Sequence, residues 1–150
     1  MSDLPTLAFA GIGLMGLPMC RRLLAAGYRL AGWNRSPEKC QPLVELGARA
    51  VATPAELCAE ADIVLLCLAD TAAVREVLFG KGGIAGGGKA GKVLVDHSSL
   101  EPTATRDMAA ELEFRSGMRW VDAPVSGGTA GAEADGYVEL QSRSGLFFES

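Results

Sequence analysis

The chain has 150 residues, of which 49% are hydrophobic and 6% aromatic, and its formal net charge is −4 at pH 7. This length predicts one domain, long enough to bury about two-thirds of its unfolded surface. With this acidic balance nothing suggests a basic surface for nucleic acid, and small molecules are the expected partners. Four cysteines without a CxxC pair predict reduced, buried thiols, and a single histidine argues against a metal site.

Residues 1–5 do not form a basic segment followed by an apolar core, so we expect no signal peptide and a cytoplasmic location. The longest apolar run, residues 63–69, is far shorter than the roughly twenty residues needed to span a bilayer. We therefore expect no membrane as a partner.

Short apolar runs alternate with helical patterns along most of the chain. Strands are expected at residues 6–11, 28–33, 62–68, 92–96 and 119–122, with a short one at 48–52. Helices are expected at residues 14–26, 37–47, 71–79 and 103–117, with a short one at 54–60. This alternation predicts βαβ units and an α/β fold with a Rossmann-type doubly wound, mostly parallel sheet.

Glycine, proline and capping residues support these helix boundaries. Gly27 and Gly47 stand where helices should stop, and Ser36 and Thr53 precede prolines as expected helix caps. The glycine-rich segment 80–91 is expected to be a loop, because it precedes a strand and lacks the Gly-Lys-Ser/Thr ending of a phosphate-binding loop.

The first strand runs directly into Gly11, Gly13 and Gly16, and a helical pattern follows. In a dinucleotide-binding turn, the first glycine allows a tight bend, the second lets the backbone approach a pyrophosphate, and the third lets the helix pack closely. The helix N-terminus then offers N–H groups to the phosphates. The apolar residues of this helical pattern, which fall roughly on one side, are Leu14, Leu17, Leu23 and Leu24.

The end of the second strand reads Asn34-Arg35-Ser36 and has no carboxylate. An acidic residue there would bind the ribose 2′-hydroxyl of NAD, whereas an arginine can pair with a 2′-phosphate. Asn34 and Ser36 would supply neutral contacts. The sequence therefore predicts NADP rather than NAD, with the alternative that Arg35 is a solvated residue and Ser36 only a cap.

Later strands end in polar residues at the edge where ligands of open α/β sheets bind. Asp70 follows one strand, and Asp96, His97 and Ser98 follow the next. Asp96 and Ser98 could equally satisfy local backbone groups or cap the following helix. His97 is a candidate proton donor, unless its ring points away from the ligand.

The last predicted strand leads to Ser126, Gly127 and Gly128. The exposed N–H groups of such a tight turn could form a nest for the carboxylate of an anionic substrate. The alternative is an ordinary glycine turn after a strand.

Four motifs occur in order: GIGLMGLPM at 11–19, NRS at 34–36, DHSS at 96–99 and DAPVSGG at 122–128. With them the chain resembles the β-hydroxyacid dehydrogenase family, which includes 3-hydroxyisobutyrate dehydrogenase and tartronate semialdehyde reductase, over roughly residues 6–138. The last motif is the specific one, because glycine spacing alone is common.

The resemblance implies an NADP-dependent oxidoreductase of small β-hydroxy acids or the corresponding semialdehydes. It implies that the cofactor is held by Gly11, Ile12, Gly13, Leu14, Met15, Gly16, Asn34, Arg35, Ser36, Leu68, Ala69 and Ser99. It also implies that Ser126, Gly127 and Gly128 bind the substrate carboxylate. Ala69 replaces a proline often found in the family, and His97 stands at a variable position.

The family's proton-transferring lysine would lie beyond residue 150, so no catalytic residue is assigned and we expect no activity from this chain alone. Residues 1–138 are expected to form the dinucleotide-binding domain without the family's all-helical domain, and residues 139–150 a divergent or truncated tail. Apolar surface that would meet the helical domain could drive formation of a homodimer.

Two other functions stay open at this point. One is a noncatalytic NADP-binding module that acts as a sensor or associates with another chain. The other is an α/β domain for a different nucleotide or an adenosyl compound, which would leave the Ser-Gly-Gly turn without a role.

Overall fold

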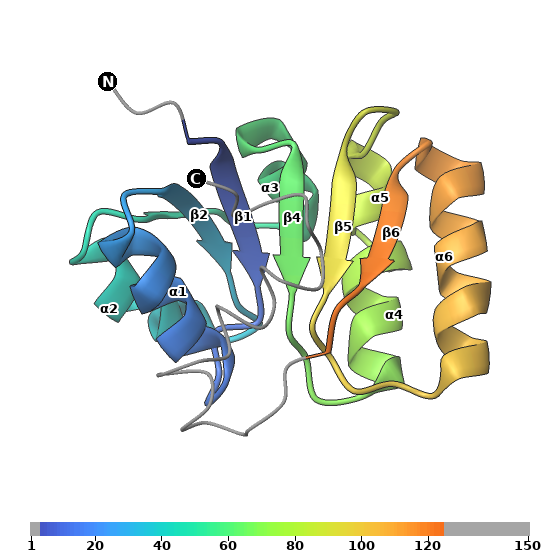
Figure 1. The fold of residues 1–150 in the computed structure, drawn as a ribbon, viewed down its shortest axis with the longest axis horizontal. Coiled ribbons are helices and arrows are strands. Elements are labelled where there is room, and N and C mark those ends of the chain that lie inside the picture. The colour runs from blue at the N-terminus through green and yellow to red at the C-terminus, as the bar shows by residue number, and fades with distance from the viewer. Residues whose placement is uncertain (1–3, 125–150) are drawn as a thin grey trace.

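The structure is a computed structural model that describes residues 4–124, and these form one six-stranded sheet (Figure 1). The strands are β1 (Thr6–Ala10), β2 (Arg29–Trp33), β3 (Arg49–Ala50), β4 (Ile63–Leu66), β5 (Val93–Asp96) and β6 (Arg119–Asp122). Their order is β3-β2-β1-β4-β5-β6, and every neighbouring pair is parallel. The strand order reverses between β1 and β4, as in doubly wound sheets, so the predicted fold is confirmed.

Helices cover both faces of this sheet (Figure 1). The helices are α1 (Gly16–Ala25), the 3-10 helix η1 (Pro37–Cys40), α2 (Gln41–Val44), α3 (Pro54–Glu60), α4 (Thr71–Phe79), α5 (Ile84–Gly87) and α6 (Pro102–Ser116). Buried residues of α1 and α2 pack in one apolar cluster, and those of α3, α4, α5 and α6 pack in a second on the opposite face. No helix within residues 4–124 has the length and hydropathy of a membrane span.

The alternation of side chains along β1 explains why the sheet is buried on both sides. Leu7 and Phe9 belong to the cluster under α1, whereas Ala8 and Ala10 belong to the cluster under α3 and α4, and all four are fully buried. Strands with two covered faces read as continuous apolar runs, which is the pattern seen in residues 6–10.

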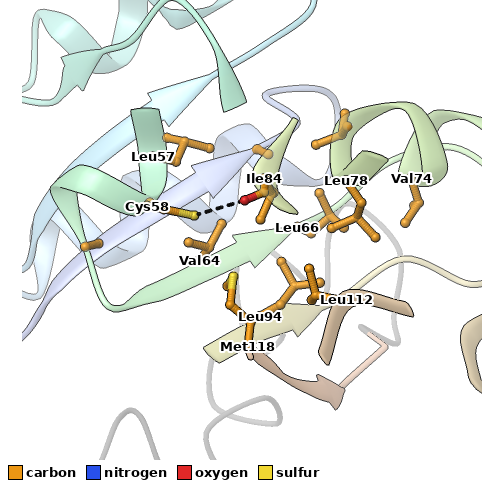
Figure 2. Packing of buried hydrophobic residues seen from close by; sticks show 14 of the residues in the cluster. Leu57, Cys58, Val64, Leu66, Val74, Leu78, Ile84, Leu94, Leu112 and Met118 are labelled. Atoms are coloured by element: carbon orange, nitrogen blue, oxygen red, sulfur yellow. Dashed lines mark hydrogen bonds between the residues drawn. The ribbon is translucent and has the colours of Figure 1, made fainter. Parts of the chain in front are cut away.

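The glycine-rich segment 80–91 is not entirely a loop, which corrects the prediction. It contains the single helical turn α5, whose Ile84 is fully buried. The Cys58 thiol of α3 lies 3.7 Å from the Ile84 carbonyl oxygen that accepts its hydrogen bond (Figure 2). A Cβ on Gly87 would collide with the Ala55 backbone. Gly87 therefore lets α5 pack closely against α3, a contact that composition alone did not indicate.

The helix predicted at residues 37–47 is divided into η1 and α2, with Pro42 in the first turn of α2. Proline has no N–H to donate, so a continuous helix would lose a hydrogen bond there. Gly27 and Gly47 end their helices with φ of +98° and +104°, as predicted. Ser36 and Thr53 occupy the cap positions, but their side chains make no capping hydrogen bond.

Candidate functional site: the carboxyl edge at the switch point

The three glycines of the first turn serve different purposes. Gly11 has φ +102°, and a Cβ there would collide with the Cys67 carbonyl oxygen. A Cβ on Gly16 would collide with the Gly11 carbonyl oxygen. Gly13 is exposed, and a Cβ there would meet nothing within 4 Å. Gly11 and Gly16 are therefore required by the fold itself. At Gly13 the backbone is exposed, and the described residues leave the space beside it open.

The N-terminus of α1 is left uncapped. It has neither a side-chain capping bond nor an acidic residue in its first turn. By contrast, Asp70 caps α4 through a 2.8 Å bond from the Ala73 amide, and Glu101 caps α6 through 2.9 Å bonds from the amides of Thr103 and Ala104. Within α1 itself, however, the Leu17 amide already donates to the Gly13 carbonyl oxygen at 2.9 Å, and Pro18 has no N–H. The amides that make no hydrogen bond with the described residues are those of residues 13–16, at the positive end of the α1 dipole.

The end of β2 is tied to the glycine turn through Asn34. Its Oδ1 accepts a 2.8 Å hydrogen bond from the Ile12 amide, and its Nδ2 donates a 3.1 Å bond to the Ser36 carbonyl oxygen. The second N–H of the Asn34 side-chain amide makes no hydrogen bond with the described residues. Arg35 is exposed beside it, and its guanidinium makes no ion pair with the described residues. In this motif, Asn34 therefore fixes the end of β2 to the glycine turn, while Arg35 offers a charge that no described residue neutralises.

Two adjoining hollows bring most of the predicted cofactor residues together. One, of about 290 Å³, is lined by Gly13, Leu14, Met15, Gly16, Cys67, Leu68 and Ala69. The other, of about 300 Å³, is lined by Trp33, Asn34, Arg35, Leu68, Ala73, Glu76 and Val77. Leu68 lines both hollows. A larger hollow of about 560 Å³ includes Thr6 and Arg29, at the amino ends of the strands, where open α/β sheets do not bind their ligands.

Asp96 and Ser98 connect the loops that follow β4 and β5. The Leu68 amide donates to Ser98 Oγ, and the Ser98 amide donates to Asp96 Oδ1, both at 2.9 Å. The structure therefore supports the reading in which these two side chains satisfy local backbone groups. Glu101, which the sequence prediction did not single out, caps α6 instead.

His97 lies in the interior and away from the hollows. Its Nδ1 is 2.9 Å from the Ala123 carbonyl oxygen, and its ring centroid is 6.3 Å from that of Phe9. Burial lowers the pKa of the His97 imidazole to about 4, and burial raises the pKa of the Asp96 carboxyl to about 6. The imidazole is therefore neutral near pH 7 and poorly placed to give a proton to a ligand.

Several predicted residues differ in environment from their neighbours. Leu14 is 83% exposed and precedes α1, so, contrary to the prediction from the sequence, it does not share a helix face with the buried Leu23. Ser99 is exposed after β5 and lines neither of the two hollows. The predicted substrate residues Ser126, Gly127 and Gly128 lie outside the described residues.

Sequence reasoning missed the contribution of α4. Ala73, Glu76 and Val77 line the hollow that also contains Arg35. Their i, i+3, i+4 spacing places them on one face of a helix, and α4 starts directly after a central strand. That spacing was the available signal.

Comparisons with known proteins agree with this geometry. Residues 6–138 match the family described as the NAD binding domain of 6-phosphogluconate dehydrogenase. The 2-(hydroxymethyl)glutarate dehydrogenase of Eubacterium barkeri is 36% identical over 143 residues, covering 95% of this chain and 47% of that protein.

Two solved structures share the fold. 3-Hydroxyisobutyrate dehydrogenase of Mycobacterium tuberculosis, solved with L-serine, has a TM-score of 0.79 at 32% identity and covers 87% of this chain. Psf3 in complex with NADP+ and 2-OPP has a TM-score of 0.80 at 32% identity and covers 86%. The chain spans 44% and 45% of those two proteins, less than half of each. It belongs to the family of NAD(P)-binding oxidoreductases that includes 6-phosphogluconate dehydrogenase and 3-hydroxyisobutyrate dehydrogenase, and it corresponds to their nucleotide-binding domain.

Proposed function

We propose that this chain binds NADP at the carboxyl edge of β1, β2 and β4 and serves as the cofactor domain of an oxidoreductase of small β-hydroxy acids. The cofactor-binding residues in this proposal are Gly11, Ile12, Gly13, Leu14, Met15, Gly16, Asn34, Arg35, Ser36, Leu68, Ala69 and Ser99. The observation that carries it is the end of β2, where residues 33–36 contain a free arginine and no carboxylate.

Arg35 supports NADP over NAD because it is positively charged and makes no ion pair with the described residues. A guanidinium binds a phosphate through two parallel hydrogen bonds, and such charge-assisted bonds are stronger than neutral ones. Arg35 lines a hollow together with Asn34 and Leu68, close to the turn where the pyrophosphate would lie. The relative Psf3 was solved with NADP+, which is consistent with this choice of cofactor.

Open space at Gly13 and the uncapped start of α1 fit the pyrophosphate. A Cβ at Gly13 would meet nothing within 4 Å, so phosphate oxygens can approach the backbone there. The amides of residues 13–16, which make no hydrogen bond with the described residues, would donate to those oxygens, and the helix dipole favours their negative charge. When bound, the nicotinamide supplies the hydride chemistry, and the protein supplies its binding and orientation.

The substrate half of the proposal extends past the described residues. In it, residues 1–138 make up the dinucleotide-binding domain, and Ser126, Gly127 and Gly128 hold the carboxylate of a hydroxy acid or semialdehyde. Support comes from the relatives, since one acts by name on 2-(hydroxymethyl)glutarate and another is named for 3-hydroxyisobutyrate.

A fluorescence titration of the purified chain with NADPH, and separately with NADH, tests the cofactor assignment. We expect saturable binding that favours NADPH. Arg35→Asp should weaken NADPH by roughly 10- to 150-fold, the equivalent of one charge-assisted hydrogen bond, and should affect NADH much less. Lys89→Asp is the matched control, because it changes the charge equally at an exposed position before β5, at the opposite edge of the sheet.

The outcomes separate the parts of the proposal. Equal affinities for the two cofactors, or equal losses of both in Arg35→Asp, would remove the NADP assignment and leave a dinucleotide site. Absence of binding to either cofactor would overturn the proposal for this chain.

A further inference from the structure

We propose that Glu76 recognises the adenine base of the cofactor by accepting a hydrogen bond from its 6-amino group. The inference rests on the proposed NADP site and adds a specificity-determining residue to it. The base would occupy the hollow of about 300 Å³ that Arg35 and Glu76 both line.

The topology places this hollow where the adenosine must lie. β2 and β4 are the two neighbours of β1, so the end of β2 and the start of α4 flank the glycine turn. With the pyrophosphate at that turn and the ribose at the end of β2, the base extends beyond the ribose. The hollow continues there from Arg35 to the face of α4 that carries Ala73, Glu76 and Val77.

The lining of the hollow suits a purine ring. Trp33, Leu68, Ala73 and Val77 provide apolar surface, and Val77 is only 5% exposed. Such surface packs against the faces of an aromatic ring, while the ring edge needs polar partners. Glu76 is the side chain in this lining that is only a hydrogen-bond acceptor when ionised.

The two charges in the hollow match the two ends of adenosine 2′-phosphate. Neither Arg35 nor Glu76 makes an ion pair with the residues that the structure describes. A carboxylate beside a phosphate site is unfavourable unless the ligand also brings a hydrogen-bond donor. The 6-amino group of adenine is such a donor, and it lies at the end of the nucleoside away from the ribose phosphate.

The Glu76 side chain has room to adjust to a ligand. Its Oε1 lies beside Gly80, where a Cβ would be only 2.6 Å away. In this structure the carboxylate therefore lies toward Gly80, and Glu76 is exposed on α4 without an ion pair to the described residues. Turning it toward a base in the hollow breaks no ion pair with the described residues and costs the conformational entropy of one side chain.

This arrangement predicts discrimination at position 6 of the purine. Hypoxanthine carries a carbonyl oxygen where adenine carries an amino group, so it would face the Glu76 carboxylate with a second acceptor. Binding sites built to pair with a donor reject analogues that lack it, because the site's own polar group is left unpaired.

The test compares NADPH with its hypoxanthine analogue, deamino-NADPH, by fluorescence titration of the wild-type chain and of Glu76→Ala. We expect the wild type to bind NADPH about tenfold more tightly than deamino-NADPH. Glu76→Ala should bring that ratio close to one, mainly by weakening NADPH. Glu113→Ala, which removes an exposed carboxylate from α6, is the matched control and should keep the wild-type ratio.

A wild type that binds both dinucleotides equally, or a Glu76→Ala variant that keeps the wild-type ratio, would overturn this inference and leave the NADP site standing. Failure of the wild type to bind either dinucleotide would overturn the proposed function, and the role of Glu76 with it. Glu76→Gln is a further test. Its amide can accept from the adenine amino group and can also donate to the hypoxanthine oxygen, so this variant should bind the two dinucleotides with similar affinity.

Discussion

Gly13→Val should abolish tight binding of the cofactor without destabilising the fold. A Cβ at this position meets nothing within 4 Å, and the residue lies outside the positive-φ region that disfavours side chains. We therefore expect the free energy of unfolding to stay within about 0.5 kcal/mol of the wild type, as for other surface substitutions. The added methyl groups would instead fill the space through which a pyrophosphate approaches the backbone.

The expected loss of affinity follows from the bonds that the side chain blocks. Each hydrogen bond from a backbone amide to a charged oxygen contributes about 1.5–3 kcal/mol. Losing one of them weakens binding by roughly 10- to 150-fold. Titration with NADPH measures this loss, and thermal denaturation of the same sample measures the stability.

Gly16→Ala is the contrasting variant. Its Cβ would collide with the Gly11 carbonyl oxygen, so we expect a clear drop in the melting temperature before any question of binding arises. If Gly13→Val instead kept the wild-type affinity, the glycine turn would not be where the pyrophosphate binds. If Gly13→Val unfolded the chain, the space beside Gly13 would not be open, and our assignment of that space to the ligand would be wrong.

Two further predictions concern the loops after β4 and β5. Ser98→Ala removes the acceptor of the Leu68 amide and should cost about 1 kcal/mol, lowering Tm in a thermal melt by roughly 4 °C; an unchanged Tm would contradict this. The raised pKa of Asp96, about 6 against an ordinary 3.8, means that the folded state holds a proton that the unfolded state releases. Its contribution to stability is therefore present below pH 4 and lost as the pH rises to 6. The lowered pKa of His97, about 4, has the opposite effect on the pH dependence of stability. The unfolded state binds a proton that the folded state does not, so stability is lost as the pH falls from 6.5 toward 4. Relative to the wild type, Asp96→Asn should gain up to about 3 kcal/mol between pH 4 and pH 6, measured by urea denaturation. A difference that does not vary with pH would show that Asp96 does not titrate in this range.

Much of the fold could be predicted because its signals are local. The apolar run before Gly11 and the positive-φ helix stops at Gly27 and Gly47 each reflect a property of a few adjacent residues. Such signals gave the elements nearly at their observed bounds. They also gave the candidate cofactor residues, which the sheet topology then brings to one edge.

The remaining features depend on contacts between distant segments. The helical turn α5 lies so close to α3 that a Cβ on Gly87 would collide with the Ala55 backbone, and no local pattern encodes that contact. Asn34 was expected to contact the ligand, yet its side chain also connects Ile12 to the strand end through bonds that only the folded geometry reveals. For Glu76 the helical spacing indicated only a shared face with Ala73 and Val77, and its place in one hollow with Arg35 follows from the folded sheet.

The hydrogen bonds that complete the glycine turn have a consequence for folding. The Gly11 amide donates to the Trp33 carbonyl oxygen, and the Cys67 amide donates to the Ala10 carbonyl oxygen, both at 3.0 Å. The second bond requires β4, whose parallel pairing with β1 joins segments more than fifty residues apart, and such non-local pairing is slow to form. The nucleotide site is therefore completed by the same event that completes the centre of the sheet. A ligand that binds only this completed state stabilises the whole sheet, by about 1.4 kcal/mol for each tenfold excess over its Kd. The concentration of the cofactor would then determine how long the domain resists proteolysis, as well as the fraction of its sites that hold a cofactor.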